Sequence, residues 1–216
     1  MSVLDKSNIK IYHFGPMVKR YKLNNEFCKE MLNRGLSTKI SHQEELAGII
    51  EQKDQFGQYR YTEEDINYFS RNMTEILSDY RFSQNLIFEQ EDNIQDIPQY
   101  KLNSLWINIM GPGDFNPPHI HSGDLSFVLY LKVPKELKEE NERYVGRSEG
   151  PGNILLQFGE NLTWAVSNKS VFPEENMMLV FSSSLRHSVY PYKSNVERIS
   201  LSGNFEVINK KNGSYY

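Results

Sequence analysis

The residues of this chain best suited to metal chemistry are three of its five histidines. His119 and His121 are one residue apart, and His187 follows 66 residues after His121. Residues two apart on a β-strand point to the same face, so His119 and His121 can reach one ion together. Imidazole binds zinc, iron and copper, and three protein ligands leave positions open on an octahedral ion. The spacing predicts an open metal site, and Pro117 and Pro118 fix the approach of the strand that carries the pair.

A second polar group follows eleven positions after His187, on a segment with strict alternation. One face of this predicted strand is polar, with Arg198, Ser200, Ser202 and Asn204, and the other is largely apolar, with Ile199, Leu201, Phe205 and Val207. A guanidinium can hold a carboxylate through two parallel hydrogen bonds, and the Ser200 hydroxyl can add a third. An H-x-H pair alone is often a surface feature, and an isolated arginine usually forms an ordinary salt bridge. Their combination favours a metal enzyme that also binds an organic acid.

Composition narrows the class of protein. The chain has 216 residues, which suits one domain with a sizeable core, and its net charge is −4 with a pI near 5.8. Lysine and arginine are scattered, so we expect no nucleic-acid partner. Mean hydropathy is −0.60, no apolar run approaches the roughly 18 residues of a spanning helix, and the first ten residues lack the apolar core of a signal peptide. The single cysteine, Cys28, fits a reducing compartment, and we expect a cytoplasmic protein.

The predicted secondary structure that must position these residues changes from mainly helix to mainly strand near residue 100. Before it, a short strand is predicted over Ile9–Phe14, followed by three helices. The first is capped near Asn24, the second starts at Ser41 with Leu46, Ile49 and Ile50 as its apolar stripe, and the third starts at Thr62. The buried face predicted for the third helix comprises Ile66, Phe69, Met73, Ile76 and Leu77.

After residue 100 the pattern indicates strands separated by turn clusters rich in glycine and proline. The predicted strands are Ser104–Met110, Leu125–Val133, Asn153–Phe158, Met177–Phe181 and Arg198–Val207. Short punctuated strands indicate a jelly roll. We therefore expect a single domain, mostly β with α. It comprises a helical region 1–100 packed on one face, a double-stranded β-helix over 101–208 and a polar tail over 209–216.

The motifs in this second half resemble the Fe(II)/2-oxoglutarate-dependent oxygenases, in particular a group common in marine bacteria and their phages. The matching segments are Trp106-x-Asn108, Asn116–His121, Ser126–Leu131, Leu179–Val189 and Glu197–Ser200. The resemblance implies Fe(II) held by His119 and His187, and 2-oxoglutarate held through its distal carboxylate by Arg198 and Ser200. It also implies hydroxylation of an unknown protein side chain or small molecule, with succinate and carbon dioxide as coproducts.

The chain departs from that family at one ligand. Most such enzymes have H-x-D, whereas this sequence has His121 at the second position. We expect His121 to bind the metal directly. The alternatives are that Asp124 supplies a carboxylate through a turn at Ser122 and Gly123, or that water fills the position with His121 behind it.

Other assignments follow from position along the chain. Asn108 and Tyr130 are expected to contact the cosubstrate, and Trp106 to line the cavity, although Trp106 and Tyr130 also suit ordinary core packing. The charged segment from Lys135 to Gly150 is either a lid or a solvated excursion, and residues 83–100 are placed near the site entrance. Two rival functions remain: a three-histidine dioxygenase that does not use 2-oxoglutarate, and a non-enzymatic jelly-roll binding or structural module.

Overall fold

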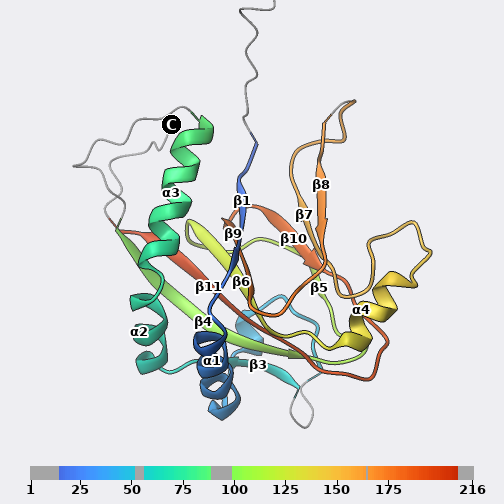
Figure 1. Ribbon diagram of the computed structural model, residues 1–216, viewed down its shortest axis with the longest axis horizontal. Coiled ribbons are helices and arrows are strands. Elements are labelled where there is room, and N and C mark those ends of the chain that lie inside the picture. The colour runs from blue at the N-terminus through green and yellow to red at the C-terminus, as the bar shows by residue number, and fades with distance from the viewer. Residues whose placement is uncertain (1–14, 52–55, 89–98, 164, 209–216) are drawn as a thin grey trace, which may run out of the picture.

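Two facing antiparallel sheets form the body of the protein in a computed structural model that describes residues 15–51, 56–88, 99–163 and 165–208 (Figure 1). The larger sheet has seven strands, in the order β1 (Val18–Lys22), β9 (Met177–Ser182), β6 (Leu125–Lys132), β11 (Arg198–Val207), β4 (Tyr100–Met110), β3 (Gly57–Arg60) and β2 (Ile40–Ser41). The smaller sheet has four, in the order β5 (Asn116–His119), β10 (Arg186–Val189), β7 (Ile154–Gln157) and β8 (Asn168–Val171). This arrangement confirms the predicted jelly roll.

Alternate residues of the central strands point into two separate cores. In the space between the sheets, Val128 and Tyr130 of β6 pack with Leu179 of β9 and Leu156 of β7. The intervening residues, such as Leu129, belong to a second core on the outer face of the larger sheet. Strand β6 is therefore buried on both faces, as its nearly continuous apolar run predicts.

Three helices cover the outer face of the larger sheet (Figure 1): α1 (Asn25–Ser37), α2 (Glu63–Arg71) and α3 (Thr74–Phe88). The predicted cap of α1 is confirmed, because the side chain of Asn24 accepts hydrogen bonds from the first backbone N–H groups of the helix. A capping box between Thr62 and Asp65 starts α2. Phe69 of α2 stacks on Phe127 of β6, with ring centroids 5.0 Å apart. Among the residues that the structure describes, no helix is long and apolar enough to span a membrane.

The helix predicted from Ser41 is wrong. Ser41 lies in β2, a short 3-10 helix covers Gln43–Glu45, and Ile49 forms an isolated bridge with Phe115. The backbone N–H of His42 donates to the carbonyl of Gln58 at 2.9 Å. Pairing with residues distant in the sequence thus overrides a local capping signature.

The third predicted helix is two helices. Helix α2 ends at Arg71, and α3 begins at Thr74 after a break at Asn72 and Met73. Met73 is nevertheless buried, as its place on the predicted apolar face requires. The strand predicted over Ile9–Phe14 lies outside the described residues, as does the tail 209–216.

The stacked pair of Phe69 and Phe127 gives a direct test of how the helices are held to the sheet. We expect Phe69→Ala to lower the free energy of unfolding by about 3–5 kcal/mol, because the deletion leaves a cavity in the helix–sheet core. Urea unfolding followed by circular dichroism measures this loss. The control is Phe82→Ala on α3, whose residue is 67% exposed and whose removal should change stability by less than about 0.5 kcal/mol. Equal effects of the two variants would contradict the packing described.

Candidate metal centre

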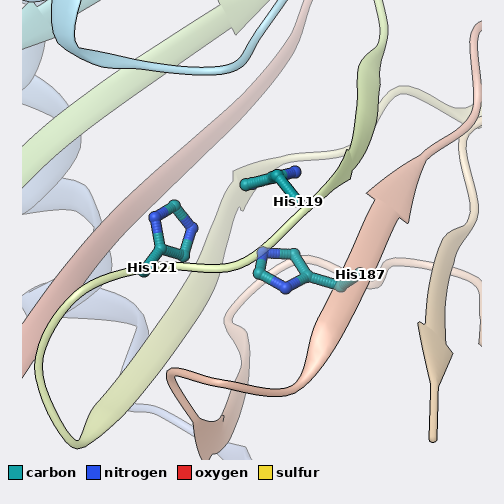
Figure 2. A group of neighbouring side chains, drawn as sticks. All are labelled: His119, His121 and His187. Atoms are coloured by element: carbon teal, nitrogen blue, oxygen red, sulfur yellow. The ribbon is translucent and has the colours of Figure 1, made fainter.

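The fold brings the three predicted histidines together at the mouth of the inter-sheet space. His119 on β5 and His187 on β10 are direct partners in the antiparallel pairing of these two strands. The available nitrogens of His119, His121 and His187 all lie within 4.8 Å of one another, and Figure 2 shows the three rings gathered close together. Two neighbouring strands and the segment after β5 thus create a three-nitrogen cluster from residues far apart in the chain.

His121 lies just beyond the end of β5 and is held there by its backbone. Its N–H donates to the carbonyl of Ser183 at 2.9 Å, so the chain remains close to the end of β9 after β5 stops. Gly123 then turns the chain toward β6 with a φ of +93°, a conformation that favours glycine. The pair therefore shares a face as predicted, although β5 itself includes only the first of the two histidines.

Hydrogen bonds to the backbone select the tautomer of two of the rings. Nδ1 of His119 lies 2.7 Å from the carbonyl oxygen of Pro117, and Nδ1 of His187 lies 2.9 Å from that of Leu185. A carbonyl accepts only, so each Nδ1 carries the proton and donates it. The lone pair of Nε2 is then available on both rings for a metal ion.

All three histidines are held in the neutral form that a metal requires. Burial, together with the neighbouring His187 and His119, lowers the pKa of His121 to about 3. Burial likewise lowers the pKa of His187 to about 4, and burial lowers the pKa of His119. At neutral pH the cluster therefore offers three uncharged nitrogen ligands without first losing protons.

Asp124 points away from the cluster. Its carboxylate accepts a hydrogen bond from the backbone N–H of Val207 at 2.7 Å, and it lines a different cavity, beside Tyr100 and Leu125. In this structure the carboxylate helps to fix the start of β6 against the end of β11. The sharp turn at Gly123 is present as predicted, but it leads Asp124 to the end of β11 and not toward the histidines.

The residues predicted to bind an organic acid line the same cavity as the histidines. Arg198, Ser200, Asn108 and Tyr130 all face it, and Arg198 is 1% exposed. One guanidinium N–H of Arg198 donates to the carbonyl of Gly152 at 3.0 Å and another contacts the sulfur of Met110. Nε of Arg198 is buried without a partner, and no carboxylate of the described residues forms an ion pair with this side chain.

A buried guanidinium without a counter-charge indicates an anion site. Burying an unpaired charge costs several kcal/mol, so such groups normally have a partner. The hydroxyl of Tyr130 is also buried without a hydrogen bond, and the centre of the Arg198 guanidinium lies 5.9 Å from the centroid of its ring. Burial raises the pKa of Tyr130 to about 12, so the hydroxyl remains a donor at neutral pH. Two unpaired donors therefore face one region of the cavity.

The polar residues of the cavity form a row across four strands of the larger sheet. Gln58, Asn108, Ser200 and Tyr130 are successive cross-strand partners on β3, β4, β11 and β6. The Nδ2 group of Asn108 lies 3.4 Å from the hydroxyl oxygen of Ser200, and Nε1 of Trp106 donates to Oδ1 of Asn108 at 3.1 Å. Trp106 thus lines the cavity and orients Asn108, as well as packing near His121 with ring centroids 5.6 Å apart.

Two amide residues that line the cavity, Gln58 and Asn116, were not assigned to the site by the sequence interpretation. Gln58 is on the four-residue strand β3, and Asn116 begins β5 before two prolines. Neither segment shows the alternation of a half-buried strand, and a lone amide carries no signal of its own. Only the pairing of β3 with β4 shows that Gln58 is buried beside Asn108.

The segment from Lys135 to Gly150 does not line the histidine cavity. It begins with α4 (Lys135–Glu142), whose Leu137 is fully buried, and the Glu140 carboxylate accepts hydrogen bonds from the backbone of Lys193 and Ser194. The segment borders a separate groove. Of residues 83–100, those from 89 to 98 lie outside the described residues, and Gln84, Phe88 and Tyr100 line the cavity of Asp124.

A jelly roll with a histidine cluster between its sheets defines a class of metal-binding domain, and comparisons with known proteins place this one more narrowly. Residues 104–204 match the family described as "Putative 2OG-Fe(II) oxygenase". No curated protein matches the sequence.

Two solved structures illustrate the similarity of the fold, and a third matches over a shorter region. The viral collagen prolyl hydroxylase of Paramecium bursaria Chlorella virus-1, in its 2OG complex, aligns with a TM-score of 0.51 and 14% identity over 88% of this chain and 96% of that chain. A prolyl-4-hydroxylase of Pseudomonas putida gives 0.50 and 16% over 88% and 92%. An oxidoreductase of the 2OG-Fe(II) oxygenase family from Burkholderia pseudomallei gives 0.35 and 20% over 50% and 44%, so this chain spans less than half of that protein.

Residues 104–204 are therefore similar to the 2OG-Fe(II) oxygenase family. The matched region includes the three histidines and the cavity residues Arg198 and Ser200. The predicted cofactors, Fe(II) and 2-oxoglutarate, are those of the family. Gln58 and the three helices α1 to α3 lie outside the matched region.

The neutral histidines predict acid sensitivity of the metal-free protein. Unfolded histidines titrate near pH 6.5, whereas His187 in the fold titrates near 4, so the unfolded chain binds more protons between these values. Stability should fall as the pH falls through this window, by about 1.4 kcal/mol per pH unit for His187 alone. Urea unfolding in the presence of a chelator measures the slope. His187→Gln should flatten it, and an unchanged slope in that variant would contradict a neutral buried His187.

Proposed function

We propose that this chain is an Fe(II)/2-oxoglutarate-dependent dioxygenase that hydroxylates a protein side chain or a small molecule. The observation that carries the proposal is one cavity that holds both a neutral three-histidine cluster and a buried guanidinium without a carboxylate partner. Metal chelation and anion anchoring are the two tasks that this cosubstrate requires of the protein. The matched family supports the same assignment.

In this proposal, His119, His121 and His187 bind Fe(II). Their nitrogens converge, and the Nδ1 protons of His119 and His187 are already held by backbone carbonyls, which leaves Nε2 for the metal. Three imidazoles suit a divalent iron ion and leave open positions on it. Since Asp124 is engaged at the sheet edge, His121 is the residue that takes the place of the usual carboxylate.

Arg198 and Tyr130 anchor the distal carboxylate of 2-oxoglutarate. The unpaired Nε of Arg198 and the hydroxyl of Tyr130 are the buried donors that such an anion would satisfy. Ser200 adds a hydroxyl at the same level of the sheet, and Asn108 holds that hydroxyl through its amide. The fit rests on donors that have no other described partner, so an anion would remove a cost already present in the fold.

With both groups bound, the iron and the cosubstrate supply the oxidising chemistry, and succinate and carbon dioxide leave as coproducts. The contribution of the chain is to orient the metal and the cosubstrate and to enclose them. The buried apolar residues Ile154 and Phe181 line the cavity, which limits access of water. The cosubstrate would bring two negative charges to a ligand set that has none, so its binding also balances the charge of the metal.

A second function is favoured by one specific observation. Three histidines without a carboxylate also suit a dioxygenase that does not use 2-oxoglutarate, and Asp124 is not placed to supply that charge. The buried Arg198 argues for the first function, because such a rival has no need of an anion anchor. Release of succinate distinguishes the two.

We also propose a cytoplasmic location, since the single thiol, Cys28, is buried and free.

The ligand assignment predicts which side chains control iron binding. Anaerobic addition of Fe(II) and 2-oxoglutarate should produce the weak visible absorption of the chelate in the wild type, and His121→Ala should lose it. Asp124→Asn should retain it, because an amide oxygen can still accept from Val207 while the carboxylate charge is gone. Loss of the band in Asp124→Asn with retention in His121→Ala would reverse the assignment of the second ligand.

The anion assignment predicts a strong effect of a conservative change. Arg198→Lys should raise the 2-oxoglutarate concentration needed for half-maximal succinate formation by about 10- to 100-fold, because a point charge cannot reproduce the planar donor fork. Arg186→Lys on β10, where the arginine is exposed, is the matched control and should leave this value unchanged. An unchanged requirement in Arg198→Lys would place the anchor elsewhere.

A further inference from the structure

The far end of the polar row holds a second set of unpaired groups, and these are acceptors. Oε1 of Gln58 and Oδ1 of Asn116 are buried without a hydrogen-bond partner, and both residues line the histidine cavity. Gln58 is 1% exposed, so its oxygen has no access to bulk solvent. Leaving a buried acceptor unpaired costs about 1–3 kcal/mol, which a merely structural amide would avoid.

The hydrogen-bond chain of the row fixes the orientation of Gln58. The indole N–H of Trp106 can only donate, so the Asn108 atom that faces it must be the amide oxygen. That oxygen also accepts from Gln58 at 2.7 Å, so the Gln58 atom that faces it must be the amide nitrogen. The remaining atom of Gln58 is therefore an oxygen, and it is an acceptor. Trp106 thus determines which chemical group Gln58 presents to a ligand.

Glycine at position 48 lets the backbone approach both acceptors closely. A Cβ atom at Gly48 would lie 2.9 Å from Oε1 of Gln58 and 2.9 Å from Oδ1 of Asn116. The two acceptors are thus close enough for one donor group to reach both, and any side chain at this position would crowd them. A side chain at position 48 would therefore disturb both amides.

The charge of the cavity restricts what kind of donor fits. The cavity contains the buried guanidinium of Arg198, and no aspartate or glutamate is among the described residues that line it. Even with doubly charged 2-oxoglutarate bound, Fe(II) and the Arg198 guanidinium would leave the site with a net positive charge, so a cationic donor would find no counter-ion. A neutral N–H group meets the two acceptors without that penalty.

We infer that Gln58, Asn116 and Gly48 form a specificity-determining subsite for a neutral carboxamide N–H group of the prime substrate. The inference rests on the proposed function, because it treats the Arg198 end of the row as the place of the cosubstrate and the Gln58 end as the place of the substrate. It deepens that function by naming a substrate class: molecules or peptides that present an uncharged amide beside the bond to be oxidised.

Three probes of similar shape test the inference by binding alone, without turnover. Isobutyramide, isobutyrate and isopropylammonium are titrated by ligand-observed NMR into protein loaded with Zn²⁺ in place of iron. We expect isobutyramide to bind in the presence of saturating 2-oxoglutarate and isopropylammonium not to bind. Failure of isobutyramide to bind, or binding of isopropylammonium with equal affinity, would overturn the inference.

Two variants locate the amide probe. Gln58→Met removes the acceptor at similar volume, and Gly48→Ala places a methyl group against both amides; each should weaken isobutyramide about five- to tenfold. Gln157→Met, on β7 at a different cavity, is the control and should leave affinity unchanged. Unaltered affinity in both subsite variants would show that the amide binds elsewhere.

A stability measurement separates this role from a structural one. Gln58→Met loses one hydrogen bond to Asn108 but also removes a buried unpaired acceptor, so its urea midpoint should equal or exceed that of the wild type. A clear drop in the midpoint would identify Gln58 as a structural residue.

The third probe distinguishes failure of the inference from failure of the proposed function. Isobutyrate should bind at Arg198 and be displaced by 2-oxoglutarate. Its affinity should be unchanged in Gln58→Met. If 2-oxoglutarate does not displace it, the cosubstrate assignment is wrong. If displacement occurs but the affinity for isobutyramide is the same in both subsite variants as in the wild type, the proposed function stands and the subsite is wrong.

Discussion

Side chains of β11 alternate between two environments that cannot be exchanged, and both the core and the cavity depend on this alternation. Ile199 and Leu201 are buried against the helices, whereas Arg198 and Ser200 face the inter-sheet cavity. A shift of one residue would move the guanidinium into the apolar core and expose the aliphatic side chains. Because burying an unpaired charge among apolar groups costs several kcal/mol, helix packing on one face fixes the chemistry of the other.

The same sheet also separates unpaired hydrogen-bond donors from unpaired acceptors within one cavity. Unpaired donors, on Arg198 and Tyr130, lie at one end of the row that crosses β3, β4, β11 and β6, and unpaired acceptors lie at the other. Hydrogen bonds run from Gln58 through Asn108 to Ser200 and do not extend to the unpaired donors. The neutral histidines add no charge to either end. The cavity therefore offers donors at one end and acceptors at the other, and this difference would orient a ligand before any chemistry begins.

Much of this arrangement could be predicted from local pattern, because a strand buried on one or both faces leaves a periodic record in the sequence. The bounds of β11 agree with the prediction, and β6 and β9 agree within one residue. Local pattern failed where distant pairing decides the structure. The capping signature at Ser41 gives way to pairing of β2 with β3, and Gln58 reaches the cavity only through β4. The histidine cluster was predictable in composition, but the direct pairing of His119 with His187 is a property of the folded sheet.

Each of two histidine rings is oriented by a carbonyl two residues earlier in its own chain segment, Pro117 for His119 and Leu185 for His187. Many metal sites instead rely on a separate carboxylate or amide side chain to hold the ring. Here the orienting atom belongs to the main chain, so no single side-chain substitution elsewhere can delete it. The tautomers of these two rings are thereby protected against mutation as long as the short strands that carry them keep their course.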